Sequence, residues 1–372
     1  MKILLVARWP VGGIKTYFRY IYGSEEFVGT EITLLAPAED LENFLATQLP
    51  EGRIKLVPTE TGYFAFTKSL KKCLQHEHFD LVHSHGFSAS LFVQSVLCTK
   101  RIPHIMTAHD VFLPSTFAGF SGVLKKWVMS WMLNSVTKVL SVSEDARVNI
   151  LEYFPKLSSS QVMNITNGVD TLFFKQGVAR NFRQELLIAD DRPIIGFFGR
   201  FMAQKGFHQV IQAIEIIHKS NAQTAKPIVL TFGWGGFIRE DFTLIEQKGL
   251  SDYFVQLPGT NDMPAAIKGV DLVVMPSRWE ACPLLPMEVL STGTPIIGTN
   301  CIGLREVIQN TPAKIVAVDD SRALAEAIQT QIAEGKEVFQ DFQDTAVARF
   351  SADVHSKSLY AFYLNLLSGK NL

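Results

Sequence analysis

The sequence has few cysteines, no long apolar run and almost no net charge. Its cysteines, Cys73, Cys98, Cys282 and Cys301, stand far apart without a Cys-x-x-Cys pair, which argues against both a zinc site and a disulfide framework. No stretch reaches the roughly 18 uncharged apolar residues that a membrane-spanning helix needs. A formal net charge of -1 gives no electrostatic reason to expect nucleic acid as a partner. The first apolar run, Ile3–Val6, is too short for a signal peptide, so we expect a cytoplasmic protein.

Two common nucleotide-binding motifs are also missing. No Gly-x-x-x-x-Gly-Lys-Ser/Thr sequence occurs, and Gly233–Gly236 lacks the full glycine fingerprint of a dinucleotide-binding dehydrogenase. No metal-ligand cluster is evident, and Asp319 and Asp320 stand at an expected helix start, where capping explains them. The sequence therefore predicts neither a metal ion nor another cofactor.

What is present is a regular alternation of short apolar runs and helical patterns. With 372 residues, 47% hydrophobic and 19% charged, the chain has room for two well-buried domains. Continuous apolar strands between helices are typical of a parallel sheet covered on both faces, the α/β class. The predicted strands are Ile3–Val6, Ile32–Leu35, Ile54–Val57, Leu81–His83, His104–Thr107 and Val139–Val142, then Ile194–Phe198, Ile228–Phe232, Tyr253–Leu257, Leu272–Met275 and Pro295–Thr299.

The alternation is interrupted once, at a turn signature, Asn167–Asp170, followed by the polar stretch Lys175–Arg183. We therefore predict a first domain at 1–172, a second at 173–350, and a closing segment at 351–372. Asp353–Leu367 is expected to form an amphipathic helix that packs back towards the first domain, although packing on the nearer domain is equally compatible with the pattern. The apolar face of this helix is predicted to hold Val354, Leu359, Phe362, Tyr363 and Leu366.

Both predicted domains begin with a strand, a glycine-bearing loop and a helix. Gly12 and Gly13 follow the first strand, whereas Gly199, Arg200 and Lys205 follow the strand Ile194–Phe198. Such a turn presents free backbone N–H groups and the positive end of a helix dipole to an anion. Two cations at the carboxyl end of a buried strand strengthen this interpretation. The alternatives are a tight turn at the glycine pair and two solvated surface charges.

The most informative stretch runs from Pro276 to Glu288. Pro283 and Pro286 forbid one continuous helix, so Glu280 is expected in a loop. Pro286 suits the start of a helix, which puts Glu288 in its first turn, as a ligand group or only as a partner of the helix dipole. The N–H groups expected to point out of this helix start towards a ligand are those of Leu284 and Leu285.

Taken in order, these motifs resemble the family-four retaining glycosyltransferases of the GT-B fold, in which two Rossmann-like, doubly wound domains face a central cleft and a C-terminal helix crosses back. The resemblance covers nearly the whole chain. It rests on Gly12-Gly13, Asp80–His85, Thr107–Asp110, Ser141–Glu144, Asn167–Asp170, Gly199–Gly206, Gly233–Gly235, Pro258-Gly259, the two glutamates eight positions apart, Ser291–Ile297 and the closing helix.

The resemblance implies roles for the candidate residues. Arg200 and Lys205 are expected to bind the donor diphosphate and to stabilise the charge that develops on it. Glu280 is expected to contact the transferred sugar, and Glu288 the ribose hydroxyls, with His109 beside the reacting sugar. The other residues implied at the donor site are Gly12, Gly13, Gly199, Thr260, Pro283, Leu284 and Leu285.

The chain departs from the family after the first glutamate. The family usually has a Gly-Phe-Gly-like step there, whereas this chain has Ala281-Cys282-Pro283, and Pro283 offers no N–H donor. Phosphate binding does not depend on that step, but recognition of the donor sugar does. Cys282 as a nucleophile has no activating base marked in the sequence.

The resemblance implies a retaining, metal-independent hexosyltransferase that uses a nucleotide-sugar donor, such as a UDP- or GDP-sugar. A glycan or lipid-linked acceptor is expected, with a place in the biosynthesis of cell-surface polysaccharide, lipopolysaccharide or glycolipid. A non-catalytic nucleotide-sugar or glycan-binding subunit and a nucleotide-sugar epimerase of the same architecture remain alternatives.

One aromatic and basic cluster has two interpretations. In the first, it is part of a buried core; in the second, it makes a peripheral contact between the first domain and the inner face of the membrane. The cluster consists of Phe117, Phe120, Lys125, Lys126, Trp127 and Trp131.

Overall fold

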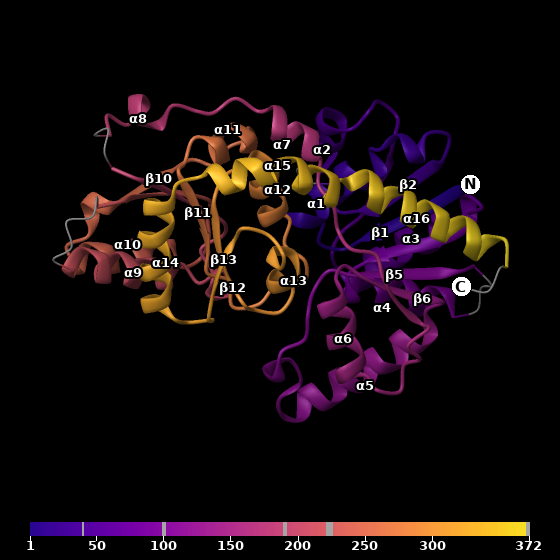
Figure 1. Cartoon of the computed structure of the whole chain (residues 1–372). Coiled ribbons are helices and arrows are strands. Elements are labelled where there is room, and N and C mark those ends of the chain that lie inside the picture. The colour runs from indigo at the N-terminus through magenta and orange to yellow at the C-terminus, as the bar shows by residue number, and fades with distance from the viewer. Residues whose placement is uncertain (39–40, 99–101, 189–191, 221–225, 370–372) are drawn as a thin grey trace. The chain divides into compact units, whose positions relative to one another are not determined.

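A computed structural model describes residues 1–38, 41–98, 102–188, 192–220 and 226–369 (Figure 1). The chain forms two compact units. Unit 1 comprises Met1–Gly168 and the final segment from Ala352, and unit 2 comprises Val169–Ser351. Residues 370–372 of the predicted closing segment lie outside the described residues.

Unit 1 is built on a seven-stranded sheet with the order β3-β2-β1-β4-β5-β6-β7, in which all neighbours are parallel. The central strands β1, β4 and β5 are buried along almost their whole length because helices cover both faces of such a sheet. The strands are β1 Lys2–Ala7, β2 Glu31–Ala36, β3 Lys55–Pro58, β4 Leu81–His85, β5 His104–Ala108, β6 Lys138–Ser141 and β7 Val162–Asn164. The helices are α1 Gly13–Tyr17, η1 Phe18–Tyr22, η2 Glu25–Phe27, α2 Leu41–Gln48, α3 Tyr63–His76, α4 Phe87–Leu97, η3 Pro114–Phe117, α5 Gly119–Ser135, α6 Glu144–Tyr153 and α16 Ala352–Leu367.

Unit 2 repeats this plan on a six-stranded parallel sheet with the order β10-β9-β8-β11-β12-β13. Its strands are β8 Ile194–Phe198, β9 Ile228–Phe232, β10 Phe254–Leu257, β11 Leu272–Met275, β12 Ile296–Thr299 and β13 Lys314–Val316. Its helices are α7 Thr171–Gln176, α8 Phe182–Glu185, η4 Ala203–Lys205, α9 Phe207–Lys219, α10 Ile238–Gln247, η5 Ser251–Tyr253, α11 Met263–Lys268, α12 Leu285–Thr292, α13 Leu304–Ile308, α14 Ser321–Glu334 and α15 Glu337–Arg349. Asp320 caps α14 by accepting a hydrogen bond from the Ala323 N–H at 2.9 Å, as predicted.

Each unit has its own apolar core. In unit 2, α9 and α14 pack on strands β8, β9 and β11, and Phe207, Ile211 and Ile328 are almost completely buried between them. In unit 1, α3 and α4 bury Phe66 and Val93 against β1 and β4. Each of these two clusters is made of residues from one unit.

The closing helix α16 belongs to unit 1. Its buried face holds Ala352, His355, Ser356, Leu359, Phe362 and Tyr363. The prediction of Val354 on this face was wrong, since its side chain is exposed, and His355 was missed. A histidine reads as polar in a helical pattern, although here it is satisfied by two hydrogen bonds inside the unit.

Candidate functional site

The strand order of each sheet marks one place where a ligand is expected. In unit 2 the chain proceeds outward from β8 through β9 to β10 and then returns to β11 on the other side of β8. In unit 1 it proceeds from β1 through β2 to β3 and then returns to β4. Parallel α/β sheets bind ligands at the carboxyl ends of the strands beside such a reversal, where the loops on either side leave a crevice.

The unit 2 reversal holds two of the predicted cations. Gly199 follows β8 and donates its N–H to the Phe232 carbonyl at 3.2 Å, which ties this loop to β9. Arg200 is exposed, and in the part of the chain that the structure describes no carboxylate pairs with it. Lys205 ends the short helix η4 on the same loop. The predicted pair therefore lies at the carboxyl end of β8.

A glycine brings this loop against the loop that follows β11. Gly206 has φ +66°, and a Cβ there would lie 2.1 Å from the Pro276 carbonyl oxygen. No other residue fits both the left-handed backbone and the close approach. The contact holds the end of β8 and the end of β11 together at the reversal.

Glu280 joins the two loops through its side chain. It is 7% exposed, and its Oε1 accepts hydrogen bonds from Lys205 Nζ at 2.6 Å and from Ser277 Oγ at 2.7 Å. The Glu280 N–H donates to the Ile302 carbonyl at 3.1 Å, and the neighbouring Gly303 leaves room for this approach because a Cβ there would lie 2.3 Å from the Glu280 carbonyl oxygen. The predicted catalytic residues Lys205 and Glu280 are thus brought into direct contact.

The helix start predicted beyond Glu280 is present as α12, which begins at Leu285 with Pro286 in its second position. The Leu284 carbonyl accepts from the Glu288 N–H at 3.0 Å. Leu284 and Leu285 are partly exposed, and the amides of a first helical turn have no acceptor within the helix. Glu288 lies buried in that first turn, and Pro283 is buried just before it.

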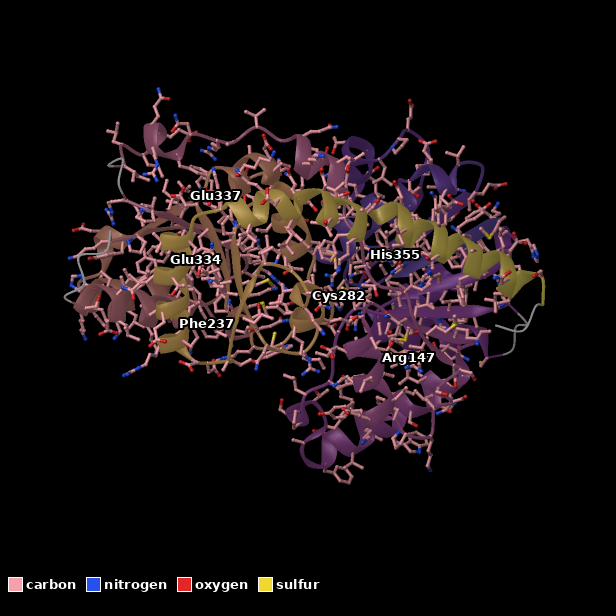
Figure 2. All side chains as sticks on the ribbon, in the orientation of Figure 1. Arg147, Phe237, Cys282, Glu334, Glu337 and His355 are labelled. Atoms are coloured by element: carbon pink, nitrogen blue, oxygen red, sulfur yellow. The ribbon has the colours of Figure 1, made fainter. Side chains whose placement is uncertain are left out.

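Cys282 is buried as a free thiol beside Pro283 (labelled in Figure 2). Thr260, by contrast, lies apart from the Lys205–Glu280 pair. It follows β10, which is separated from β8 by β9, and its Oγ1 accepts from the Asp262 N–H at 3.1 Å. Its loop forms the outer part of the same carboxyl edge.

In unit 1, Gly12 and Gly13 follow β1 at the reversal, as predicted. Gly12 has φ +55° and precedes α1, and a Cβ at either glycine would meet no other atom within 4 Å. The space above this turn is therefore open. Helix α1 is one turn long and continues directly into the π-helix η1, which turns Phe18 and Tyr22 into the core.

His109 lies just beyond β5, next to β4 in the sheet. Its Nε2 is 3.0 Å from Nδ1 of His85, the last residue of β4, and the two rings stack with centroids 5.3 Å apart. One proton lies between the two nitrogens, so one ring donates and the other accepts. Burial lowers the pKa of His109 to about 3 and places the pKa of His85 well below its usual value. The pair is therefore uncharged at neutral pH.

A buried network continues from His85 into the core. The Tyr22 hydroxyl is 3.2 Å from His85 Nε2, 3.1 Å from His83 Nδ1 and 3.1 Å from the Tyr363 hydroxyl on α16. His83 Nε2 bonds the Thr107 hydroxyl at 2.7 Å. Each ring nitrogen thus has a fixed partner, which holds the imidazole of His85 in one orientation behind His109.

A histidine from α16, His355, reaches the same core (labelled in Figure 2). His355 donates through Nδ1 to the Thr166 carbonyl at 2.6 Å and accepts through Nε2 from the Tyr17 hydroxyl at 2.9 Å. Burial lowers its pKa to about 4. Tyr17 also lies edge-on to His109, with centroids 5.3 Å apart.

Several residues of these sites were not predicted. Ser277 and Gly206 lie inside the stretches Pro276–Glu288 and Gly199–Gly206, and the signal that could have found them was their closeness in sequence to Glu280 and Lys205. His85 lies just beyond the predicted strand Leu81–His83, so its position near the sheet edge was visible in the sequence but its partner His109 was not. Tyr22 and Tyr363 lie 341 residues apart and carry no local pattern that indicates their contact.

Two further properties concern the part of the chain that the structure describes. None of its helices is long and apolar enough to cross a membrane. Within the same residues no group of three or more histidine, cysteine, aspartate or glutamate side chains is arranged to hold a metal ion.

Family models match both units. Residues 11–172 match the Glycosyltransferase Family 4 model, and residues 178–346 match the model of Glycosyl transferases group 1. A curated relative, the UDP-Gal:alpha-D-GlcNAc-diphosphoundecaprenol alpha-1,3-galactosyltransferase of Escherichia coli, is 26% identical over 65% of this chain and 63% of its own length. A second, an uncharacterized glycosyltransferase of Methanocaldococcus jannaschii, is 24% identical and is covered over 61% of its length. The chain thus spans slightly less than two thirds of these relatives.

Matches that cover more of the chain are also to glycosyltransferases and to proteins of similar fold. The D-inositol 3-phosphate glycosyltransferase of Corynebacterium urealyticum is 26% identical over 83% of this chain and 77% of its own length. Among solved structures, Anabaena HepE in complex with UDP superposes with a TM-score of 0.80 at 18% identity, over 99% of this chain and 100% of that chain. A sucrose-phosphate synthase from Thermosynechococcus elongatus gives 0.82 at 17% identity over 100% of both chains. The chain therefore belongs to glycosyltransferase family four and has the GT-B fold of two Rossmann-like domains.

Proposed function

We propose that this protein is a retaining glycosyltransferase that moves a hexose from a nucleoside-diphosphate sugar to an acceptor hydroxyl without a metal ion. The observation that carries the proposal is the cluster of cations at the carboxyl edge of the unit 2 sheet. There Arg200 and the Lys205–Glu280 pair lie at the reversal between β8 and β11, in the unit that also holds the start of α12.

The donor diphosphate is the ligand that this cationic edge suits best. Arg200 has no competing carboxylate among the described residues, and Lys205 has three N–H donors, so it can keep Glu280 and still bind a phosphate oxygen. The amides of Leu284 and Leu285 add two donors at the positive end of a helix. These groups supply the positive charge that a divalent metal ion supplies in other transferases.

The remaining donor contacts follow from the family. We assign Glu288 to the ribose hydroxyls, Glu280 to the transferred sugar and the Thr260 loop to the base. Pro283 has no N–H and contributes only shape. We assign Gly12, Gly13 and Gly199 to backbone contacts with the donor phosphates, since a glycine places no side chain in the way.

In the reaction the acceptor oxygen forms a bond to the anomeric carbon on the same face from which the diphosphate departs. The departing phosphate oxygen takes the acceptor proton, so the acceptor hydroxyl is converted to a glycosidic oxygen and the donor to a nucleoside diphosphate. Arg200 and Lys205 stabilise the charge that grows on the diphosphate. His109, held neutral by His85, is assigned to a hydroxyl of the transferred sugar as a hydrogen-bonding partner.

The names of similar proteins suggest a class of donor and of acceptor for this chain. HepE has been solved with UDP and with UDP-glucose, and the Escherichia coli relative is named for a UDP-galactose donor and a diphosphoundecaprenol acceptor. We propose a UDP-sugar donor and a glycan or lipid-linked acceptor, in the synthesis of cell-surface polysaccharide, lipopolysaccharide or glycolipid.

The test is a screen of UDP- and GDP-sugars with the purified chain and no acceptor, in which release of nucleoside diphosphate is measured. One donor is expected to be consumed slowly because water replaces the acceptor. Arg200→Ala should abolish this consumption, whereas Arg239→Ala, a change of an arginine with no assigned role in the same unit, should not. Binding of a nucleotide sugar without any consumption, with and without added glycan acceptors, would favour a non-catalytic subunit.

A further inference from the structure

Helix α5 of unit 1 carries a continuous exposed apolar stripe. Phe120 is 89% exposed, Trp127 69% and Trp131 44%, with Val123 and Leu124 also exposed between them. These positions recur at intervals of three and four residues, so they share one face of the helix. A contiguous apolar face of this kind, unlike a single exposed side chain, marks an interaction surface.

The opposite face of α5 is the one that contributes to the core. Met129, Met132 and Leu133 are buried against β5, β6 and α6. Phe117, which precedes α5, is partly buried and packs on Phe112 with ring centroids 5.3 Å apart. Of the two interpretations of this cluster, a buried core therefore applies only to Phe117, and the stripe itself faces outward. Figure 1 shows α5 at the margin of unit 1.

The charge on α5 has one sign. Residues 119–135 contain Lys125 and Lys126 and no aspartate or glutamate. Both lysines are exposed, with their Nζ atoms 5.7 and 5.8 Å from the centre of the Phe117 ring. Their long side chains can keep the ammonium groups at a polar surface while the stripe enters an apolar phase. The partner that complements this surface has an apolar interior for the stripe and a negatively charged surface for the lysines, and a bilayer that contains anionic lipids has both.

A second copy of the chain fits this surface less well. The stripe extends only from Phe120 to Trp131, about 16 Å of helix. A stable protein interface has roughly 20–30 residues on each side, whereas the stripe offers five large side chains. Two copies joined at α5 would also bring the Lys125–Lys126 pairs of both chains to one interface.

We propose that α5 docks unit 1 on an anionic bilayer, with Phe120, Trp127 and Trp131 inserted at the interface and Lys125 and Lys126 against the lipid headgroups. Docking requires neither donor nor acceptor, so it stands or falls independently of the proposed reaction. Its consequence for that reaction is that a lipid-linked acceptor is met at the membrane surface by the unit that carries His109.

The experiment is co-sedimentation of the full chain with vesicles of phosphatidylglycerol mixed with phosphatidylcholine, and with vesicles of phosphatidylcholine alone. The variant Phe120→Ser/Trp127→Ser should lower the apparent partition coefficient for the mixed vesicles by roughly tenfold for each side chain. Lys125→Gln/Lys126→Gln should lower it by about tenfold or more on mixed vesicles and leave it unchanged on neutral ones. Since all four positions are exposed, the thermal midpoint should stay that of the unmodified chain.

The matched control is Phe64→Ser on α3, since Phe64 is 85% exposed in the same unit and outside the stripe. Its vesicle binding should equal that of the unmodified chain. The proposal is overturned if the unmodified chain does not bind mixed vesicles, or if Phe64→Ser weakens binding as much as the α5 variant. It is also overturned if the α5 variant dissociates a dimer in sedimentation velocity while vesicle binding is unchanged.

Discussion

Replacement of Lys205 by methionine separates its ion pair with Glu280 from its proposed contact with the donor diphosphate. Its Nζ lies 2.6 Å from Oε1 of Glu280, with the side chain of Lys205 22% exposed and that of Glu280 8% exposed. Oε1 of Glu280 accepts hydrogen bonds from Lys205 and from Ser277, and Lys205→Met removes the first of these while keeping the second. A buried ion pair that loses one partner costs roughly 3–5 kcal/mol and an exposed one at most about 1.

Because this pair is only partly buried, we expect the free energy of unfolding to fall by about 2 kcal/mol. Unit 2 should then melt roughly 4–8 °C lower. Turnover should fall by about 10²-fold to 10³-fold, the usual loss when a donor to developing charge is removed. The assays are calorimetry and the initial rate of nucleoside diphosphate release.

The double variant Lys205→Met/Glu280→Gln is the matched control. Its amide oxygen can still accept from Ser277, and no unpaired charge remains, so most of the stability should return while turnover stays low. If stability and turnover return together, the loss in the single variant was structural. Near-normal turnover by Lys205→Met would remove Lys205 from the diphosphate site.

Three other outcomes are expected. Burial lowers the pKa of His355 from 6.5 to about 4, so its neutral form favours the folded unit 1 above about pH 6.5, and this effect is lost as the pH falls towards 4. In urea titrations at several pH values, His355→Gln should flatten the dependence of the unfolding free energy on pH by up to about 1.4 kcal/mol per pH unit, and an unchanged dependence would refute the neutral burial of His355. Gly206→Ala should lower the free energy of unfolding in urea by roughly 2 kcal/mol or more, whereas Gly249→Ala, at a glycine with the same left-handed backbone but open space around it, should lower it by about 1 kcal/mol. Equal losses would mean that Gly206 does not approach the loop after β11 closely. The fragment Val169–Ser351 should fold alone, as judged by a cooperative melt, and bind UDP within about tenfold of the affinity of the full chain by calorimetry, because one apolar core and the proposed diphosphate-binding residues lie inside it. A folded fragment with no affinity for UDP would place the donor site elsewhere.

The strands were largely predictable because a parallel sheet covered on both faces gives each strand a continuous apolar run. All eleven predicted strands are present, within about one or two residues at their ends. The two that were missed, β7 Val162–Asn164 and β13 Lys314–Val316, are three residues long and lie at the outer edges of the two sheets. An edge strand of that length buries too little to leave a pattern in sequence.

The clustering of the candidate donor-site residues of unit 2 was predictable for a different reason. Arg200, Lys205, Glu280 and the start of α12 lie on loops that directly follow strands, and strand order brings those loops to one edge. The network behind His109 was not predictable, because Tyr22 and His85 meet only through tertiary packing with α16. The same limit applied to the stripe on α5, since aromatic residues at helical spacing look alike whether they face a core or solvent.

The anomeric configuration of the first sugar released tests the central claim most directly. With an α-linked UDP-sugar and no acceptor, water takes the place of the acceptor hydroxyl, and proton NMR can follow the anomeric signal before mutarotation mixes the two forms. Same-face substitution predicts that the α-anomer appears first, and that Arg200→Ala and Lys205→Met slow its appearance. Initial release of the β-anomer by the unmodified chain would contradict a retaining transfer.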